Sequence, residues 1–247
     1  MKNNYIFLCL LLVNVVWFSG YGQAAKIKSA DKDYEQYAFI DAIKTYERVA
    51  DKGYKSEDMF KKLGNAYYFN SKFEGAAKWY AELYAMAKDK NLEPEYYYRY
   101  AQSLKSIGQE TRANEILEEF ATKNNRDSRG KLFKEDKNYL TQIKANTGRY
   151  QIENAGINSK FSDYGSFVNQ NKVYFASARD TGGVNQRVHK WTGEHFTNLY
   201  AADLDSVNQT TSASSKIEKF NKSINSRFHE SSPVFTKDGK TVYFTRN

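Results

Sequence analysis

The chain has 247 residues, of which 40% are hydrophobic and 16% aromatic, and its formal net charge is +8. This length can hold one large domain or two ordinary ones, and the apolar content excludes an intrinsically disordered chain. The lysines are scattered among carboxylates, as at 134–137, and form no basic helix, so we expect no nucleic acid partner. The positive net charge favours binding to an anionic envelope surface or to an acidic partner. The alternative is that the charge only keeps the surface solvated.

Residues 1–24 have the pattern of a cleavable signal peptide, because Lys2 precedes an apolar run at 6–18 and small residues follow. A buried helix or a membrane anchor would also be apolar, but this run is shorter than the roughly 18 to 20 residues that cross a bilayer. We therefore expect an exported chain whose mature form has no transmembrane span. The single cysteine, Cys9, lies in the leader, which leaves the mature chain without disulfides or cysteine chemistry.

Residues 25–146 contain an internal repeat. Ala42 and Tyr46 recur 34 residues later as Ala76 and Tyr80, and the matching positions of a third copy, Ala113 and Leu117, follow after a further 37 residues. A 34-residue period of paired helices is typical of the tetratricopeptide repeat (TPR), which stacks into an α-solenoid. The pattern predicts helices at 27–37, 39–52, 56–70, 73–87, 94–108 and 110–124, and a C-terminal capping helix at 128–145.

The middle copy carries the TPR motif most clearly, with Phe60, Leu63, Gly64 and Tyr67 at the motif's spacing. A small residue at position 64 lets the two helices of a pair approach closely, while the large side chains fill the seam between them. In the third copy, Pro94 precedes the first helix, where its missing N–H does no harm.

The first helices of such pairs line a groove that binds extended peptides. We predict that seven side chains face this groove: Lys61, Asn65, Tyr68, Tyr98, Arg99, Gln102 and Lys105. Among them Lys61, Asn65 and Arg99 form an incomplete clamp for a carboxylate or an acidic segment. The alternative is that these polar residues only solvate the groove, or that the next domain covers them.

After residue 146 the helical period stops, and short aromatic and β-branched segments separated by turn residues replace it. Residues 147–247 are predicted to form the first blades of an incomplete β-propeller, with strands at 164–168, 173–179 and 196–202 and a hairpin at 231–247. The segment at 164–179 and the hairpin at 231–247 share one strand-turn-strand pattern, and these two copies are about 69 residues apart. This spacing is longer than that of an ordinary blade, so an insertion is expected at 181–194 or 205–215. Because a propeller closes with four to eight blades, we expect a longer natural protein.

The hairpin reads Ser232-Pro233-x-Phe235, then Asp238 to Lys240, then Val-Tyr-Phe at 242–244, and resembles the PD40 repeat of TolB-like propellers. Signal peptide, TPR array and PD40 propeller in this order resemble the PorE-like Bacteroidetes outer-membrane family, whose members continue into an OmpA-like domain. The resemblance implies a periplasmic scaffold, associated with the outer membrane, in a type IX secretion or gliding assembly. Its partners would be outer-membrane or periplasmic proteins, and peptidoglycan only through the OmpA-like domain missing from this sequence.

No catalytic, cofactor-binding or metal-binding residue is predicted. The sequence has no phosphate loop, no zinc-type His-Glu helix and no Gly-x-Ser-x-Gly elbow. His189 and His195 could be imagined as metal ligands, but they fall in a predicted loop, where surface or core histidines are commoner. We therefore predict a non-enzymatic scaffold. The alternatives are a propeller-based sensor that binds a small ligand or a glycan, and a truncated enzyme.

Overall fold

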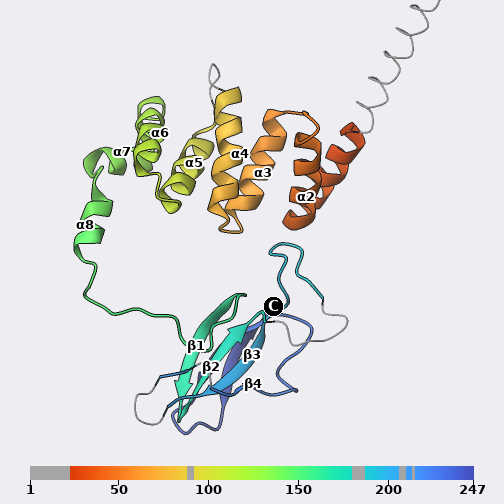
Figure 1. Cartoon of the computed structure of the whole chain (residues 1–247), viewed down its shortest axis with the longest axis vertical. Coiled ribbons are helices and arrows are strands. Elements are labelled where there is room, and N and C mark those ends of the chain that lie inside the picture. Colours follow the sequence, from red (N-terminus) through yellow and green to blue (C-terminus); the bar gives the residue numbers. More distant parts are fainter. Residues whose placement is uncertain (1–22, 88–91, 180–186, 206–209, 213–214) are drawn as a thin grey trace, which may run out of the picture. The chain divides into compact units, whose positions relative to one another are not determined.

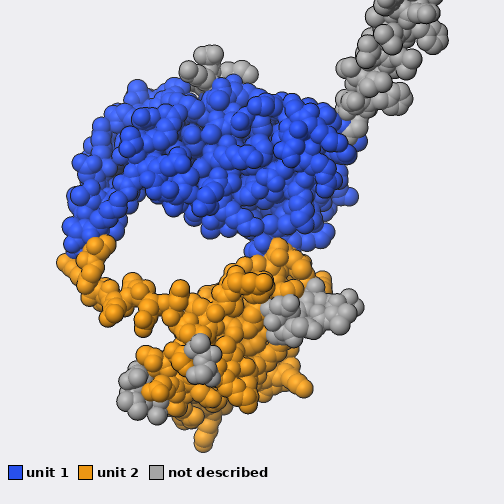
Figure 2. Space-filling view, viewed as in Figure 1, with its two compact units in different colours: residues 1–146, 190–192 blue, residues 147–189, 193–247 orange. Residues whose placement is uncertain are grey.

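The computed structural model describes residues 23–87, 92–179, 187–205, 210–212 and 215–247. Residues 1–22 of the predicted signal peptide lie outside this part of the chain, as do 181–186 and parts of 205–215 in the two predicted insertions. The chain divides into two compact units, which Figure 2 distinguishes. Unit 1 comprises residues 1–146 with 190–192, and unit 2 comprises 147–189 with 193–247.

Unit 1 is helical and unit 2 consists of antiparallel sheets, which confirms the predicted order of a helical part followed by a β part. In unit 1 a helix at 23–35 precedes α2 (Phe39–Ala50), α3 (Glu57–Tyr68), α4 (Phe73–Met86), α5 (Pro94–Ser106), α6 (Glu110–Lys123), α7 (Ser128–Glu135) and α8 (Tyr139–Ala145). The helices from α2 to α6 stand side by side in chain order (Figure 1).

Local signals explain where these helices begin. The hydroxyl of Ser56 accepts a hydrogen bond from the backbone N–H of Met59 at 3.2 Å and so caps α3. Pro94 occupies the first turn of α5, where no intrahelical donor is needed. Asp127 caps α7 by accepting from the N–H of Arg129 at 2.9 Å.

The prediction of one capping helix at 128–145 is wrong, because α7 ends at Glu135 and α8 starts at Tyr139. Asp136 leaves the helical conformation with φ −140° and ψ 80°, and its carboxylate accepts a hydrogen bond from the Gln142 side chain at 3.1 Å. Asp and Asn side chains compete with helical backbone bonds in this way. Since no residue of α8 is fully buried, packing does little to hold the helix straight through this segment.

The seam between α3 and α4 depends on two glycine–tyrosine pairs. A Cβ atom on Gly64 would lie 2.3 Å from the ring of Tyr80, and one on Gly75 would lie 2.3 Å from the ring of Tyr67. Each tyrosine therefore occupies the space that the opposite glycine leaves. The predicted role of Gly64 in close helix approach is confirmed.

Consecutive helices from α2 to α7 contact one another, and α3 also contacts α5. In contrast, α4 and α6 meet through side chains, since the hydroxyl of Tyr84 donates to the carboxylate of Glu119 and the Arg112 guanidinium lies 5.5 Å from the centroid of the Tyr84 ring. The backbones of the first helices of the pairs are closer together than those of the second helices, so this row of helices curves with α3 and α5 on its inner side. We call the surface formed by residues 61–68 of α3 and 95–105 of α5, with the adjoining residues 129–136, the inner face.

Unit 2 contains two antiparallel sheets (Figure 1). The strands β1 (Asp163–Asn169), β2 (Lys172–Ser177), β3 (Asn198–Asp203) and β4 (Ile217–Lys219) form one sheet in that order, and β5 (Glu230–Phe235) pairs with β6 (Val242–Arg246). The predicted strands and hairpin are confirmed to within a few residues. The sequence does not predict β4, because a three-residue strand has too little alternation to be recognised.

Both faces of the four-stranded sheet are packed. On one face the ring of Phe235 from β5 lies 4.4 Å from the ring of Tyr174 and 5.9 Å from that of Phe167, measured between centroids. On the other face Ile157 packs over a cluster that includes Phe175 and Tyr200. At the tip of the β5–β6 hairpin, Gly239 has a φ of +68°, which explains why the turn needs a glycine there.

Candidate partner-binding site

The seven predicted groove residues fall into two groups on the inner face. Lys61, Asn65, Tyr68 and Arg99 belong to a network of polar and aromatic contacts between helices. Tyr98, Gln102 and Lys105 instead line an open cavity. The two groups differ in whether their cations already have carboxylate partners in the described part of the chain.

Asn65 is the centre of the first group and is only 8% exposed. Its side-chain oxygen accepts hydrogen bonds from the hydroxyl of Tyr80 at 2.8 Å and from Nη1 of Arg99 at 2.7 Å, and its amide nitrogen donates to the hydroxyl of Tyr34 at 3.2 Å. One buried amide therefore joins α3, α4, α5 and the helix at 23–35. A ligand could reach this amide only by displacing these partners.

A series of ion pairs, which we call the polar ladder, continues from Asn65 through Arg99, Glu95, Arg129 and Asp127. Arg99 Nε donates to one carboxylate oxygen of Glu95 at 3.0 Å, and Arg129 Nη1 donates to the other at 2.8 Å. Arg129 is also held by Asp127 at 3.0 Å. Burial alone would raise the pKa of Glu95, but the hydrogen bond from Arg129 and the charges of both arginines lower it below its usual 4.5.

Lys61 lies beside the polar ladder and is likewise neutralised. Its Nζ atom is 2.9 Å from carboxylate oxygens of both Glu57 and Glu93, and it lies 5.3 Å from the centroid of the Tyr96 ring. Burial lowers the pKa of Lys61, but the two carboxylates outweigh this effect and raise it. In the predicted clamp, the two cations, Lys61 and Arg99, thus already have carboxylate partners, so an incoming carboxylate would have to compete with them.

The second group lines a cavity of about 330 Å³ that we call the α5–α7 cavity. Its lining residues come from α5, α6, α7 and the start of α8: Tyr98, Gln102, Lys105, Leu117, Arg129, Leu132, Phe133, Asp136 and Tyr139. Three of the seven predicted groove residues therefore meet here. The contribution of Phe133 and Tyr139 is not predicted, although Tyr139 follows Lys105 by the same 34 residues that separate Ala42 from Ala76.

Lys105 differs from Lys61, Arg99 and Arg129, each of which has a carboxylate partner. Its Nζ atom lies 4.5 Å from the centroid of the Tyr139 ring and 5.6 Å from that of Phe133, and it donates to the hydroxyl of Tyr139 at 3.4 Å. Within the described part of the chain no carboxylate lies within ion-pair distance of it. Two aromatic rings hold the ammonium group in the cavity.

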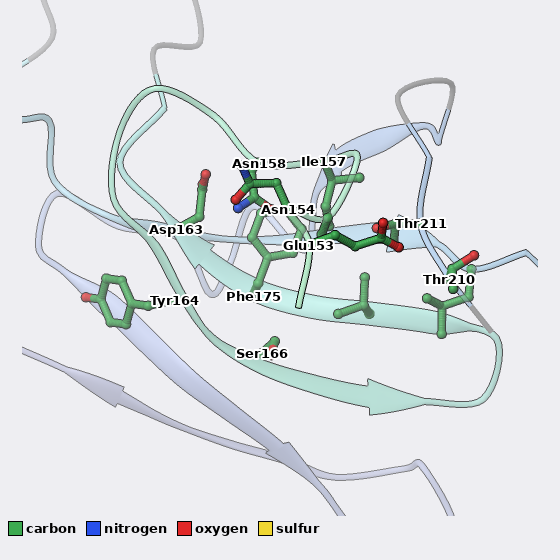
Figure 3. Close-up of a pocket in the computed structure, with 13 residues that line it drawn as sticks. Glu153, Asn154, Ile157, Asn158, Asp163, Tyr164, Ser166, Phe175, Thr210 and Thr211 are labelled. Carbon is green, nitrogen blue, oxygen red and sulfur yellow. The ribbon is translucent and has the colours of Figure 1, made fainter. Parts of the chain in front are cut away.

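Unit 2 has a pocket of its own, of about 400 Å³ (Figure 3). Glu153, Asn154, Ile157 and Asn158, from the segment before β1, gather above Phe175 of β2 in this view. Asp163 lies at its edge and forms an ion pair with Arg179 at 3.0 Å. The pocket thus combines carboxylate and amide groups with an apolar floor.

No group of three or more potential metal ligands is found among the residues that the structure describes. The two histidines considered above have different neighbours: the His189 ring is 4.9 Å from that of His229, whereas the His195 ring is 6.0 Å from that of Phe161. In the same described ranges, no helix is both long enough and apolar enough to cross a membrane.

A comparison with protein-family models gives no match, and a search of curated proteins gives none either.

Proposed function

We propose that this chain is a non-enzymatic scaffold that binds other proteins through the inner face of a TPR-type α-solenoid. The observation that carries the proposal is the α5–α7 cavity, because it is open, lies on the inner face and is lined by three residues that the repeat pattern places in a peptide groove. Peptide-binding helical arrays use this side of the solenoid.

Contacts between successive helix pairs support the solenoid. Arg99 of α5 bonds to Asn65 of α3, Arg129 of α7 bonds to Glu95 of α5, and Lys105 of α5 bonds to Tyr139 of α8. Each repeat of a solenoid is expected to contact its neighbours in this way. The two neighbouring glycine–tyrosine pairs of α3 and α4 add the close helix approach that the TPR motif requires.

For unit 2 we propose the first blades of a PD40-type β-propeller. The sequential antiparallel order β1-β2-β3-β4 is that of a propeller blade, and the β5–β6 hairpin packs against the face of this sheet as a second blade would. The long connections between β2 and β3 and between β3 and β4 accommodate the insertion that the blade spacing requires.

The proposed setting is the periplasm, at the outer membrane, in an envelope assembly of the type IX secretion or gliding kind. Support comes from the leader pattern of residues 1–24 and from the domain order, which resembles that of the PorE-like family. Outer-membrane or periplasmic proteins are the proposed partners.

The test is affinity capture of the full-length native protein from crosslinked cell envelopes. The variant combines Gln102→Arg with Leu132→Asp, since both residues line the cavity and the Leu132 side chain is 64% exposed. The control is Lys44→Asp, an exposed position on α2. The proposal predicts a partner that wild type and control capture and the double variant does not; equal capture by all three would contradict it.

A second candidate function, a ligand-binding or glycan-binding sensor, is favoured by the unit 2 pocket, because amide and carboxylate groups beside an aromatic floor suit a sugar. Calorimetric titration of the full chain with chitotetraose and maltotetraose tests it. Saturable binding that Glu153→Ala and Asn158→Ala remove, and that Lys222→Ala on the surface leaves intact, would support the sensor. Absence of binding would leave the scaffold as the better account.

A further inference from the structure

We infer that the α5–α7 cavity binds a peptide carboxylate that stands next to an apolar side chain, with Lys105 as its charge partner. The inference rests on the proposed function and names the chemistry of the segment that a protein partner presents. It also moves the predicted carboxylate site from Lys61, Asn65 and Arg99 to a different part of the inner face.

The first step is the state of Lys105. An ammonium group has three donors, and in the described part of the chain one of these donates to Tyr139, at the long distance of 3.4 Å. Lys61, in contrast, has two carboxylates at 2.9 Å. An anion can therefore bind to Lys105 without breaking an ion pair of the protein, whereas at Lys61 it would have to replace one.

The second step is the wall of the cavity. Leu117 and Phe133 are buried and form its apolar base, while Leu132 is 64% exposed at its edge. The rings of Tyr98 and Tyr139 complete the lining. A volume of about 330 Å³ is at the small end of ligand pockets, which suits one large apolar side chain with its adjoining carboxylate.

The third step is the charge balance. Lys105 and Arg129 are the cations of the lining, and Asp136 is its carboxylate. Arg129 lies 4.4 Å from the centroid of the Tyr98 ring, but Glu95 and Asp127 already bind it. Among the described residues, Lys105 is thus the cation of the lining that has no carboxylate partner, and its charge favours an anionic group over a neutral or cationic one. Asp136 lines the same cavity without an ion pair in the described part of the chain, so it disfavours a ligand with two negative charges, such as a phosphate.

The carboxylate can come from a chain terminus or from an Asp or Glu side chain, and three fluorescein-labelled probes distinguish these sources. The first is the peptide Gly-Ser-Gly-Leu-Phe with a free C-terminus, the second is its C-terminal amide, and the third is amidated Gly-Ser-Gly-Leu-Phe-Glu. Each is titrated with the full chain, and binding is followed by fluorescence polarisation. Wild type is compared with Lys105→Gln, which keeps a polar side chain of similar length, and with the control Lys44→Gln on α2.

The expected result is that one or both carboxylate probes bind at least about tenfold more tightly than the plain amide, because a charge-assisted bond to Lys105 is added. Lys105→Gln should abolish this preference without changing binding of the amide, and Lys44→Gln should change nothing. Added salt should weaken the carboxylate probes selectively. Preference for the first probe identifies a terminal carboxylate, and preference for the third identifies a side chain.

The inference would be overturned if both carboxylate probes bind no more tightly than the plain amide, if a preference for a carboxylate survives in Lys105→Gln, or if no probe binds. The proposed scaffold function fails in a different way. If capture from envelopes depends on Gln102 and Leu132 but the probes show no carboxylate preference, the inner face binds a partner and only the inferred chemistry is wrong. If capture does not depend on the cavity at all, the proposed function itself is wrong. Thermal unfolding of each variant establishes that it is folded.

Discussion

Nη1 of Arg99 in α5 donates to the side-chain oxygen of Asn65 in α3 at 2.7 Å, which links the first helices of two successive pairs. Tyr80 donates to the same oxygen at 2.8 Å, so both lone pairs of this oxygen are used within the chain. Two members of the predicted carboxylate clamp therefore stabilise the stacking of helices. The α5–α7 cavity is therefore the part of the inner face where we expect a partner to bind, because Lys105 has no carboxylate partner there in the described part of the chain.

Replacement of Asn65 tests this structural role. Asn65→Ala leaves the hydroxyl of Tyr80 and the guanidinium of Arg99 without their buried acceptor, and should lower the free energy of unfolding of unit 1 by about 1–3 kcal/mol. Asn65→Asp keeps an acceptor for both donors and should cost less. Urea unfolding followed by the helical circular dichroism signal measures both. Equal stability of Asn65→Ala and wild type would show that the network contributes nothing.

A methyl group at position 64 tests the α3–α4 seam. Gly64→Ala places Cβ 2.3 Å from the Tyr80 ring, so the helices must separate or the ring must move, at a cost of about 1–3 kcal/mol. This should exceed the gain of about 1 kcal/mol in helix propensity. Thermal unfolding is the measurement, with Lys44→Ala on the exposed face of α2 as control. A variant as stable as wild type would mean that the seam is loosely packed.

The polar ladder predicts an acid-sensitive unit 1. The pKa of Glu95 is lower in the folded chain than its usual 4.5, so the charged form is the one that Arg99 and Arg129 stabilise. Its contribution is complete above about pH 4.5 and is lost as the pH falls through the lower folded value. Melting temperatures measured from about pH 6 to pH 3 should fall less steeply for Glu95→Gln than for wild type. Parallel curves would exclude a contribution from this carboxylate.

The contact of Phe235 with Tyr174 predicts that β5 depends on the four-stranded sheet. Phe235→Ala removes a half-buried ring and should cost about 2 kcal/mol, less than the roughly 3–5 kcal/mol of a fully buried phenylalanine. The matched control is Tyr243→Ala, because Tyr243 is 66% exposed on the same hairpin. Hydrogen exchange of peptides from 230–246 should become faster in the first variant and not in the second. Unchanged exchange in both would mean that the hairpin is stable by itself.

The sequence predicts well what depends on local periodicity and turn chemistry. The helices, the role of Gly64 and the Asp238-Gly239 hairpin follow from short-range patterns, and the structure contains them. The break between α7 and α8 is not predicted, because Asp136 and its bond to Gln142 compete with a helical pattern that continues on both sides. Long-range pairing cannot be predicted from the sequence either. Nothing near Lys61 or Lys105 in the sequence indicates that Glu93 pairs with Lys61, or that Lys105 contacts two aromatic rings and has no carboxylate partner among the described residues.

The most direct test of the account is photo-crosslinking in living cells. A photoreactive amino acid replaces Gln102 in the α5–α7 cavity or, as a control, Thr111 at an exposed position of α6. The account predicts that position 102 crosslinks to an envelope protein, that Lys105→Gln weakens this crosslink, and that position 111 gives none to the same protein. No crosslink from position 102, or equal crosslinks from both positions, would contradict the claim that this chain is a scaffold that works through its inner face.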